Sequence, residues 1–343
     1  MLTREEVKAA IHFGSPPRPP RAFTKWWGEG LWEQYGDKLS AFNKYTDDIV
    51  TVDFPCPAYK KQDDGFYWRL PDAVNVQKST ALDSNALLPD WEDLPALLGE
   101  LPNTEAAGIF DNARRIADKA HAEGRYVLIR HWHLMYERIW MFRGMETLMT
   151  DYYDYPDEVH ALHRAVADTE LRLLERAIRE VKPDGYMFSD DLGTQSSLMM
   201  SPSTFREFIK PYYSQLWRYT REHGVDNWLH TCGNVTEIID DLIECGLDVL
   251  HPIQKHTMDW DAVAAKWKGK IAFWVGMDVQ DTLINGTPEE VRREVRLIRD
   301  TFDSPSGGLI YASGNGIVRG TPIENIEAYL NEIITYKNRE GTV

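Results

Sequence analysis

Seven blocks of mainly hydrophobic residues recur along the chain and predict β-strands. Each is a short run, several of them rich in β-branched or aromatic residues, and polar residues follow where it ends. The runs begin near residues 48, 126, 185, 226, 247, 271 and 308. Amphipathic segments between them predict helices, including residues 3–13, 104–124, 137–150 and 156–181. Two T-P-x-E sequences, at residues 287–290 and 321–324, mark helix starts with a proline and a capping box.

This repetition of strand, polar loop and helix predicts parallel strands joined by crossover helices. At 343 residues the chain fits an α/β fold, a (β/α)8 TIM-type barrel in which one strand is not recognisable from the pattern. We interpret residues 1–343 as a single barrel domain. Residues 1–45 form an N-terminal extension whose aromatic segment, residues 21–32, is predicted to pack over the barrel as a lid. Weak periodicity over residues 60–105 predicts an insertion before the second clear strand.

Polar side chains follow the predicted strands. In such barrels the functional groups lie at the C-terminal ends of the strands. Those ends carry Asp53, Arg130, His131, Asp190, Asp191, His230, Cys232, His251, Asp278 and Asn315. Polar residues at so many strand ends indicate an enzyme. His131 and His133 share an i, i+2 spacing that raises a second metal hypothesis, but no acid or thiol is near them in sequence, which favours substrate contacts or structural hydrogen bonds.

His230 and Cys232 are candidate zinc ligands. Two residues apart on a strand, their side chains point the same way, and an imidazole beside a thiol forms half of a zinc site. Asp53, Asp191 or His251 could complete the set, because catalytic zinc accepts mixed ligands. Asp190 and Asp191 point to opposite faces if extended, so we expect one of them to enter a shared site. The alternative is a histidine that contacts substrate beside a small, inert cysteine.

Composition narrows the possible functions. The net charge of -16 argues against a general nucleic-acid surface, which requires clustered Lys and Arg. No apolar run reaches the ~18 residues of a membrane span. The first residues show no apolar signal core, and 3 cysteines cannot form a disulfide framework, so we expect a cytoplasmic protein. Aromatic residues are abundant, with 12 Trp and 16 Tyr, and some of them could line a pocket for a flat or apolar ligand.

Several motifs, in order, resemble the uroporphyrinogen decarboxylase superfamily. They are S-D-D-L-G-T-Q at residues 189–195, S-P-S-T-F-R-E-F at 201–208, K-P at 210–211, G-T-P-E-E-V at 286–291 and T-P-I-E-N-I at 321–326. H-T-C-G at 230–233, with residues 242–250, is more similar to the corrinoid-dependent methyltransferase branch. The resemblance covers roughly residues 105–335. It implies a barrel with its site at the C-terminal face, zinc held by His-x-Cys and a later Cys, a corrinoid carried by a partner protein, and a possible homodimer.

The chain departs from both branches of this family. The later cysteine would fall where Asn315 stands, and an amide oxygen is a poor substitute for a thiolate on zinc. Cys245 should lie near a helix end, remote from the strand ends. The decarboxylase branch grips a tetrapyrrole's carboxylates with an N-terminal Arg-rich loop, whereas this chain offers Arg18 and Arg21 and then tryptophans. An aromatic pocket suits a methoxylated aromatic compound or a small methylated molecule.

We therefore predict methyl transfer between such a molecule and a corrinoid, including possible O-demethylation. The predicted catalytic residues are Asp191, His230 and Asp53, and the candidate zinc ligands are His230 and Cys232. Predicted substrate contacts are Arg130, His131, Trp132, His133, Asp190, Gln195, His251, Trp274, Asp278 and Asn315. One alternative is a metal-independent decarboxylase that uses Asp53 on a tetrapyrrole-like or other carboxylated substrate. Another is a non-catalytic protein that binds a corrinoid or its carrier.

Overall fold

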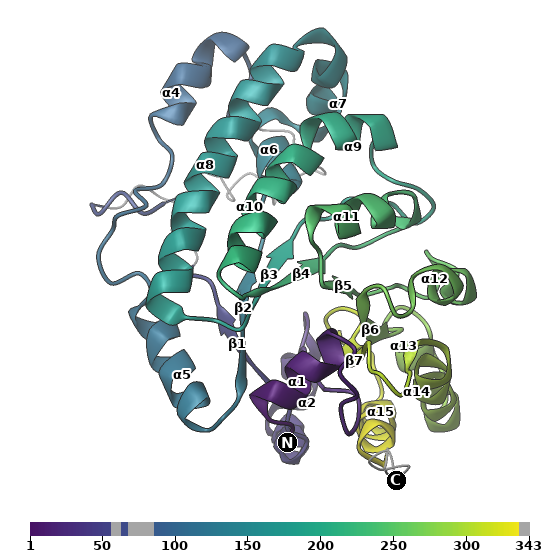
Figure 1. Ribbon diagram of the computed structural model, residues 1–343. Coiled ribbons are helices and arrows are strands. Elements are labelled where there is room, and N and C mark those ends of the chain that lie inside the picture. Colours follow the sequence, from purple (N-terminus) through teal and green to yellow (C-terminus); the bar gives the residue numbers. More distant parts are fainter. Residues whose placement is uncertain (56–62, 68–85, 336–343) are drawn as a thin grey trace.

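A single sheet of parallel strands organises the protein. The computed structural model describes residues 1–55, 63–67 and 86–335. Its strands follow one another around the sheet in chain order, as expected for a (β/α)8 fold (Figure 1). They are β1 (Ile49–Asp53), β2 (Tyr126–His131), β3 (Gly185–Ser189), β4 (Asp226–His230), β5 (Val249–His251), β6 (Ala272–Met277) and β7 (Leu309–Ser313). All seven predicted strands are confirmed.

The eighth strand position is taken by the N-terminal segment around Arg21. This residue forms a parallel bridge with Tyr311 of β7, and its carbonyl oxygen accepts a hydrogen bond of 2.8 Å from the amide of Asp48, just before β1. Tyr311 also donates its amide to the Pro20 carbonyl at 2.9 Å. Residues 20–22 therefore lie between the last strand and the first. The sequence pattern missed this strand because proline lacks the amide donor of a regular ladder.

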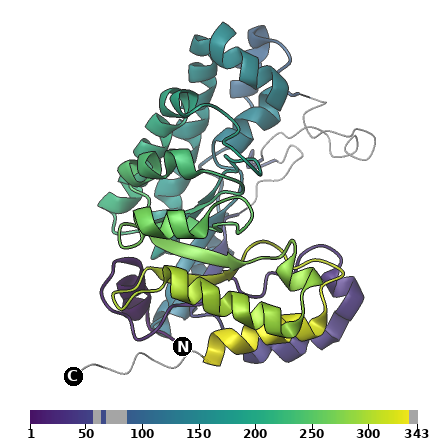
Figure 2. The same ribbon diagram turned by 90° about the vertical axis from the view of Figure 1, so that its right-hand side faces the viewer.

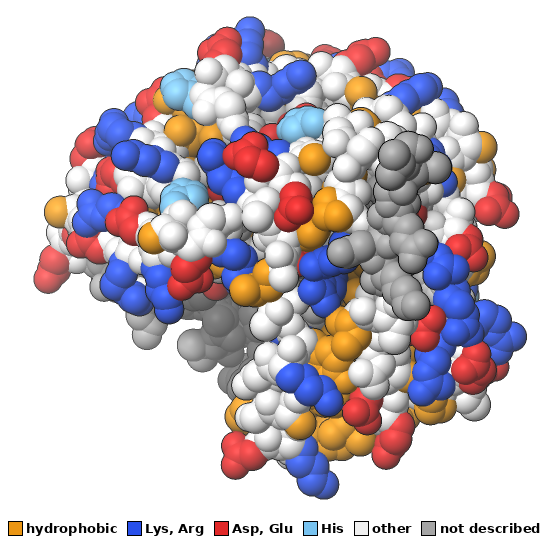
Figure 3. Space-filling view, turned by 60° about the horizontal axis from the view of Figure 1, so that its bottom comes forward, with side chains coloured by type: hydrophobic (Ala, Val, Ile, Leu, Met, Phe, Trp, Pro, Cys, Tyr) orange, Lys and Arg blue, Asp and Glu red, His pale blue; other side chains and the backbone are white. Residues whose placement is uncertain are grey.

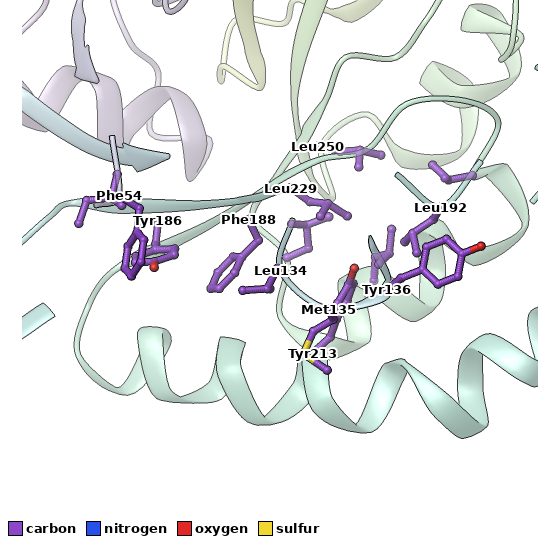
Figure 4. Close-up of a cluster of buried hydrophobic side chains, with 14 of the residues drawn as sticks. Phe54, Leu134, Met135, Tyr136, Tyr186, Phe188, Leu192, Tyr213, Leu229 and Leu250 are labelled. Atoms are coloured by element: carbon purple, nitrogen blue, oxygen red, sulfur yellow. The ribbon is translucent and has the colours of Figure 1, made fainter. Parts of the chain in front are cut away.

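Alternation along the strands divides the side chains between two cores. Inside the barrel lie Tyr126, Leu128, Met187, Trp228, Val249, Ala272, Trp274, Ile310 and Ala312. The outward residues pack under the helices, where Figure 4 shows Tyr186, Phe188, Leu229 and Leu250 with Tyr213 of a covering helix. Two of the tryptophans, Trp228 and Trp274, therefore fill the barrel.

Helices cover the outside of the sheet (Figures 1 and 2). For example, α5 packs against β1 and β2, α10 against β4, and α14 against β6 and α15. The α-helices are α1 (Arg4–Ile11), α2 (Leu31–Tyr35), α4 (Leu94–Leu98), α5 (Asp111–Ala122), α6 (Tyr136–Arg143), α7 (Met145–Asp154), α8 (Pro156–Val181), α9 (Pro202–Phe208), α10 (Lys210–Glu222), α11 (Ile239–Cys245), α12 (Trp260–Trp267), α13 (Thr282–Asn285), α14 (Pro288–Phe302) and α15 (Ile323–Thr335). The 3-10 helices are η1 (Gly36–Lys44), η2 (Trp91–Asp93) and η3 (Thr236–Ile238).

Most helix predictions are confirmed, and two are corrected. The long helix α8 has the predicted bounds, and α14 begins with the predicted capping box at Thr287. Residues 137–150 were expected to form one helix, but Gly144 has a φ of 86° and separates α6 from α7. Helix α5 begins at Asp111 rather than near residue 104. Of the predicted insertion at 60–105, the described part contains η2 and α4, and residues 60–62 and 68–85 lie outside the described residues.

Surface charge is mixed rather than segregated on the face that Figure 3 shows, where Lys and Arg alternate with Asp and Glu. Within the described residues, no helix has the length and apolar character to cross a bilayer.

Asp48 joins the N-terminal segment to the barrel, and it should make stability depend on acid pH. Its carboxylate is fully buried and accepts hydrogen bonds from the side chains of Arg18 at 2.7 Å and Arg21 at 3.3 Å. Burial opposes ionisation, but the two guanidinium groups prevail and lower its pKa to about 2.

Because the pKa is lower in the folded state, the ionised form stabilises the fold above about pH 4, and this contribution is lost as the pH falls toward 2. We expect a loss of about 2 kcal/mol in the free energy of unfolding over that interval. Urea titrations between pH 5 and pH 2 measure it. Asp48→Asn should be less stable at pH 5 and should flatten this part of the profile; an unchanged profile in that variant would show that Asp48 is not the responsible group.

Candidate active site

The site lies where the inward-facing residues of the strands reach the C-terminal mouth of the barrel. Because Trp228 of β4 and Val249 of β5 point into the barrel, His230 and His251, two residues further on, do so as well. Asp191 follows β3 in the same phase as the interior residue Met187. The phase that places Leu128 inside also directs Arg130 inward and His131 outward, toward the helices.

His230, Cys232 and Asp191 form a compact group of possible metal ligands. His230 Nε2 lies 3.6 Å from Cys232 Sγ and 3.9 Å from Asp191 Oδ1. One ligand atom of each of the three residues lies within 4.8 Å of the others. The amide of Cys232 donates a 2.8 Å hydrogen bond to Asp191 Oδ1, which fixes the carboxylate beside the thiol. His230 is buried, whereas 37% of the Asp191 side chain is exposed, so the group opens toward the barrel mouth on the Asp191 side.

This group fits a catalytic zinc ion. Zinc bonds of about 2.0 Å to nitrogen and oxygen and about 2.3 Å to sulfur place tetrahedral ligands roughly 3.3–3.7 Å apart, close to the His230–Cys232 and His230–Asp191 distances. Three protein ligands leave a fourth position for substrate, which is the pattern of catalytic rather than structural zinc. Of the three residues that could have completed the set, Asp191 is the one placed with its ligand atom among the others.

The other two candidates have different partners. Asp53 accepts a 2.6 Å hydrogen bond from Arg130, and its side chain is 67% exposed. His251 Nδ1 lies 2.7 Å from His230 Nδ1, and its Nε2 lies 3.3 Å from the carbonyl oxygen of Ser313. His251 therefore contacts the ring nitrogen of His230 that faces away from Cys232.

Burial sets the protonation of the site residues in the metal-free protein. It lowers the pKa of His230, which Asp191 opposes, and with the nearby His230 it lowers the pKa of His251 well below its usual value. The lowered pKa values favour the neutral form of both imidazoles, which is the form in which an imidazole can bind a metal. Burial, then Asp191, raises the pKa of the Cys232 thiol. The raised pKa favours the protonated thiol, and a cation beside it would favour the thiolate.

Asn315 lies at the rim, next to the thiol, where the sequence comparison expected a cysteine. Its Nδ2 approaches Cys232 Sγ at 3.6 Å, and its Oδ1 accepts a 2.8 Å hydrogen bond from the amide of Gly316. The side chain therefore presents a donor to the sulfur and is not arranged as a ligand. Cys245 lies at the end of α11, with its sulfur 3.2 Å from Ser214 Oγ, and remains remote from the site as predicted.

Aromatic rings form one wall of the site. The ring centroids of Trp26 and Trp132 lie 6.1 and 5.3 Å from that of His230 and 5.6 Å from each other. Phe23 packs on Trp26 at 4.6 Å, and the guanidinium of Arg130 lies 4.5 Å above the Phe23 ring. The predicted lid segment thus reaches the site. Phe23 and Ser313 were not predicted as site residues. No local sequence pattern relates them to His230 and His251, which lie far away in the chain.

Asp190 is separated from Asp191 by the alternation, as expected. It is fully buried on the outer side, where its carboxylate accepts hydrogen bonds from the amides of Met135, Tyr136 and Glu137 at 3.1, 2.6 and 2.7 Å. The Tyr213 hydroxyl donates a further bond at 2.7 Å. Asp190 therefore anchors the start of α6.

Four other residues that were predicted to contact substrate lie in the helix layer, the barrel interior or outer loops. His131 stacks on Phe54 at 3.8 Å and lies 2.9 Å from the Tyr186 hydroxyl. Trp274 is inside the barrel, packed on His251 at 4.0 Å. Asp278 binds amides of its own loop and lies 3.0 Å from His256 Nε2. Gln195 is exposed on the loop after β3. Their roles in substrate binding remain predictions.

His133 lies in the loop after β2 and approaches α6. Its Nδ1 lies 3.3 Å from Glu137 Oε1, and its side chain is 42% exposed. His131 and His133 thus have separate acidic neighbours, since His131 Nε2 lies 3.5 Å from Glu170. Within the described part of the chain, His131 and His133 do not form a group of three ligand atoms with any other His, Cys, Asp or Glu.

Comparison with known proteins agrees with this architecture. The family model described as "Uroporphyrinogen decarboxylase (URO-D)" matches residues 138–336, more than half of the chain. Over 132 residues the chain is 32% identical to methylcobamide:CoM methyltransferase MtaA of Methanosarcina barkeri, a match that covers 38% of this chain and 36% of that protein. Over 196 residues it is 25% identical to uroporphyrinogen decarboxylase of Anaeromyxobacter dehalogenans, a match that covers 56% of this chain and 52% of that protein. The chain thus spans about a third to a half of the length of these curated relatives.

The whole fold matches a solved structure. A methyltransferase from Methanosarcina mazei superposes with a TM-score of 0.63 over 98% of this chain and 99% of that chain, at 15% sequence identity. At that identity the match establishes the fold and no more. The family model rests on more than half of the residues, including β3 to β7 and the segment that carries His230, Cys232 and Asp191. The chain belongs to the uroporphyrinogen decarboxylase family.

Proposed function

We propose that this protein transfers methyl groups between a small methylated or methoxylated molecule and a corrinoid cofactor held by a partner protein. The observation that carries the proposal is the group formed by His230, Cys232 and Asp191 at the mouth of the barrel, beside an aromatic wall. The resemblance of part of the chain to a protein named as a methylcobamide:CoM methyltransferase supports the same chemistry.

The residues divide the work in a way that suits methyl transfer. His230, Cys232 and Asp191 would hold zinc, which lowers the pKa of a bound thiol or polarises a leaving oxygen. In the demethylation direction, a Co(I) corrinoid on the partner protein would supply the electron pair that forms the cobalt–methyl bond and would become formally Co(III). The donor's oxygen would keep the electron pair of the broken oxygen–methyl bond and take up a proton. Trp26 and Trp132 would contact the apolar part of the donor and exclude water from that side.

The position of the N-terminal arginines argues against a highly charged substrate. Arg18 and Arg21 bind Asp48, which precedes β1 and lies at the opposite end of the barrel from the site. They are therefore engaged in the fold and cannot grip the carboxylates of a tetrapyrrole at the mouth. The guanidinium of Arg130 lies over Phe23 of the aromatic wall and already pairs with Asp53.

A second candidate is decarboxylation without a metal, with Asp53 as the acting residue. Its support is the position of Asp53 at the C-terminal end of β1 and the similarity to a protein named as a uroporphyrinogen decarboxylase. The ion pair with Arg130 and the exposure of Asp53 make it a weaker candidate than the buried group around His230.

The corrinoid absorption spectrum tests the proposal. Purified protein is incubated with reduced free cobalamin and a panel of methoxylated aromatic compounds and small methylated thiols, amines and alcohols. We expect at least one donor to convert the spectrum to that of methylcobalamin. Turnover of a porphyrinogen with no methyl transfer from any donor would favour the decarboxylase. Corrinoid binding without either reaction would leave a binding protein.

A further inference from the structure

A chain of hydrogen bonds behind the site fixes which nitrogen of His230 carries its proton. The chain runs from His230 on β4 through His251 on β5 to the Ser313 carbonyl on β7, with distances of 2.7 and 3.3 Å. All three residues are buried, His251 and Ser313 completely. Strands β4, β5 and β7 thus contribute one residue each to a chain that starts at His230 Nδ1, while His230 Nε2 faces Cys232 and Asp191.

The direction of this chain follows from its last member. A carbonyl oxygen can only accept, so His251 must carry its proton on Nε2. In a neutral imidazole the other nitrogen is then an acceptor, so His251 Nδ1 accepts from His230 Nδ1. His230 in turn is left with a bare Nε2, and this is the nitrogen that lies 3.6 Å from Cys232 Sγ.

We propose that His251 is a positioning residue that holds His230 in the tautomer able to bind a metal through Nε2. This rests on the proposed function, since it assigns a support to the metal ligand named there. Metal-bound histidines usually donate their second N–H to a carboxylate, a carbonyl or water. Here the imidazole of His251 accepts that hydrogen bond. His251 in turn donates its own N–H to the Ser313 carbonyl oxygen of β7.

Packing holds His251 in the orientation that this role needs. The Trp274 ring lies 4.0 Å from the His251 ring, and its Nε1 donates a 3.1 Å hydrogen bond to the Ala22 carbonyl. Ser313 Oγ donates to the Phe23 carbonyl at 2.9 Å. The support therefore extends to the N-terminal segment, whose Phe23 and Trp26 form part of the aromatic wall.

The tautomer can be observed without any metal. In metal-free protein labelled with ¹⁵N-histidine, two-dimensional ¹H–¹⁵N spectra distinguish protonated from bare ring nitrogens, and His230→Gln assigns the His230 signals. We expect His230 to be protonated on Nδ1 and His251 on Nε2. A His230 ring protonated on Nε2 would overturn the proposal.

Zinc affinity, measured by competition with a chromophoric chelator, gives the second readout. His251→Phe removes the acceptor and should weaken zinc binding by about 10- to 100-fold. His251→Asn keeps an acceptor near the position of Nδ1 and should restore most of that loss. His163→Phe is the matched control, because His163 is an equally buried histidine on α8 whose Nδ1 bonds to Val159 of its own helix.

The outcomes separate this inference from the proposed function. Zinc affinity that is unchanged in His251→Phe would overturn the positioning role, even if methyl transfer is observed. If wild-type protein bound no zinc, the proposed metal site would fail, and the spectra would still decide the tautomer. Should His251→Phe not fold, His251→Asn and the wild-type spectra carry the test.

Discussion

Replacing Cys232 with serine is expected to remove bound zinc and to lower the rate of methyl transfer by more than about 100-fold. The thiolate is the softest and strongest zinc ligand in the group, and a serine hydroxyl does not replace it. The remaining pair, His230 and Asp191, lies 3.9 Å apart and would bind zinc weakly. Elemental analysis after dialysis, together with the corrinoid assay, measures both effects. His230→Ala should behave in the same way.

Cys245→Ser is the control for this experiment. Cys245 is a buried thiol at the end of α11 that contacts Ser214. Its replacement makes the same chemical change remote from the site, so zinc content and rate should stay at wild-type values. Wild-type rates in both Cys232→Ser and His230→Ala would remove these residues from the mechanism.

Replacing Asp190 with alanine is expected to destabilise the fold severely, by about 4 kcal/mol or more. The substitution leaves three backbone amides and the Tyr213 hydroxyl without their acceptor, and Asp190 itself is completely buried. Each unpaired buried donor costs about 1–3 kcal/mol, which is a large share of a typical stability of 5–15 kcal/mol. Urea unfolding, or soluble yield if the variant does not fold, measures the loss.

Asp191→Ala provides the comparison, because the two carboxylates are adjacent in sequence. Asp191 is partly exposed and accepts a hydrogen bond from the Cys232 amide. Its replacement should cost no more than about 1 kcal/mol of stability but should reduce zinc content. Equal stability losses in the two variants would contradict the division into an outer anchor and an inner ligand.

Local patterns predict the framework of this fold well. The strand runs, the long helix α8 and the capping box at Thr287 are short-range features, and the structure has them where the pattern places them. The alternation rule also reaches the site, since it separates Asp190 from Asp191 and places His230 and Cys232 near each other. Parallel strands in register then bring β4 beside β5, so His230 meets His251.

Local sequence patterns could not predict contacts between segments that are far apart in the chain. The strand position at Arg21 is defined by pairing with β7 and with the residue before β1, and its own sequence reads as a proline-rich turn. The sequence also did not show which strand-end residues face the interior. His131 is polar and ends β2, like the polar residues that end the other strands, yet it faces the helix layer. Side chains alternate along a strand, so only one of Arg130 and His131 can face the barrel interior.

The choice among Asp53, Asp191 and His251 as the third ligand also depended on three-dimensional distances. All three follow strand ends, and sequence alone ranks none of them. In the structure, Asp53 pairs with Arg130 and His251 supports His230, which leaves Asp191 in the group. Asn315, where a thiolate was expected, approaches Cys232 with its amide nitrogen.

The zinc content of the purified wild-type protein tests the central claim most directly, because the proposed chemistry depends on a cation at His230, Cys232 and Asp191. We expect elemental analysis to find close to one zinc ion per chain after dialysis, falling to background in Cys232→Ser and remaining unchanged in Cys245→Ser. Wild-type protein that stays free of zinc after incubation with excess zinc would contradict the account.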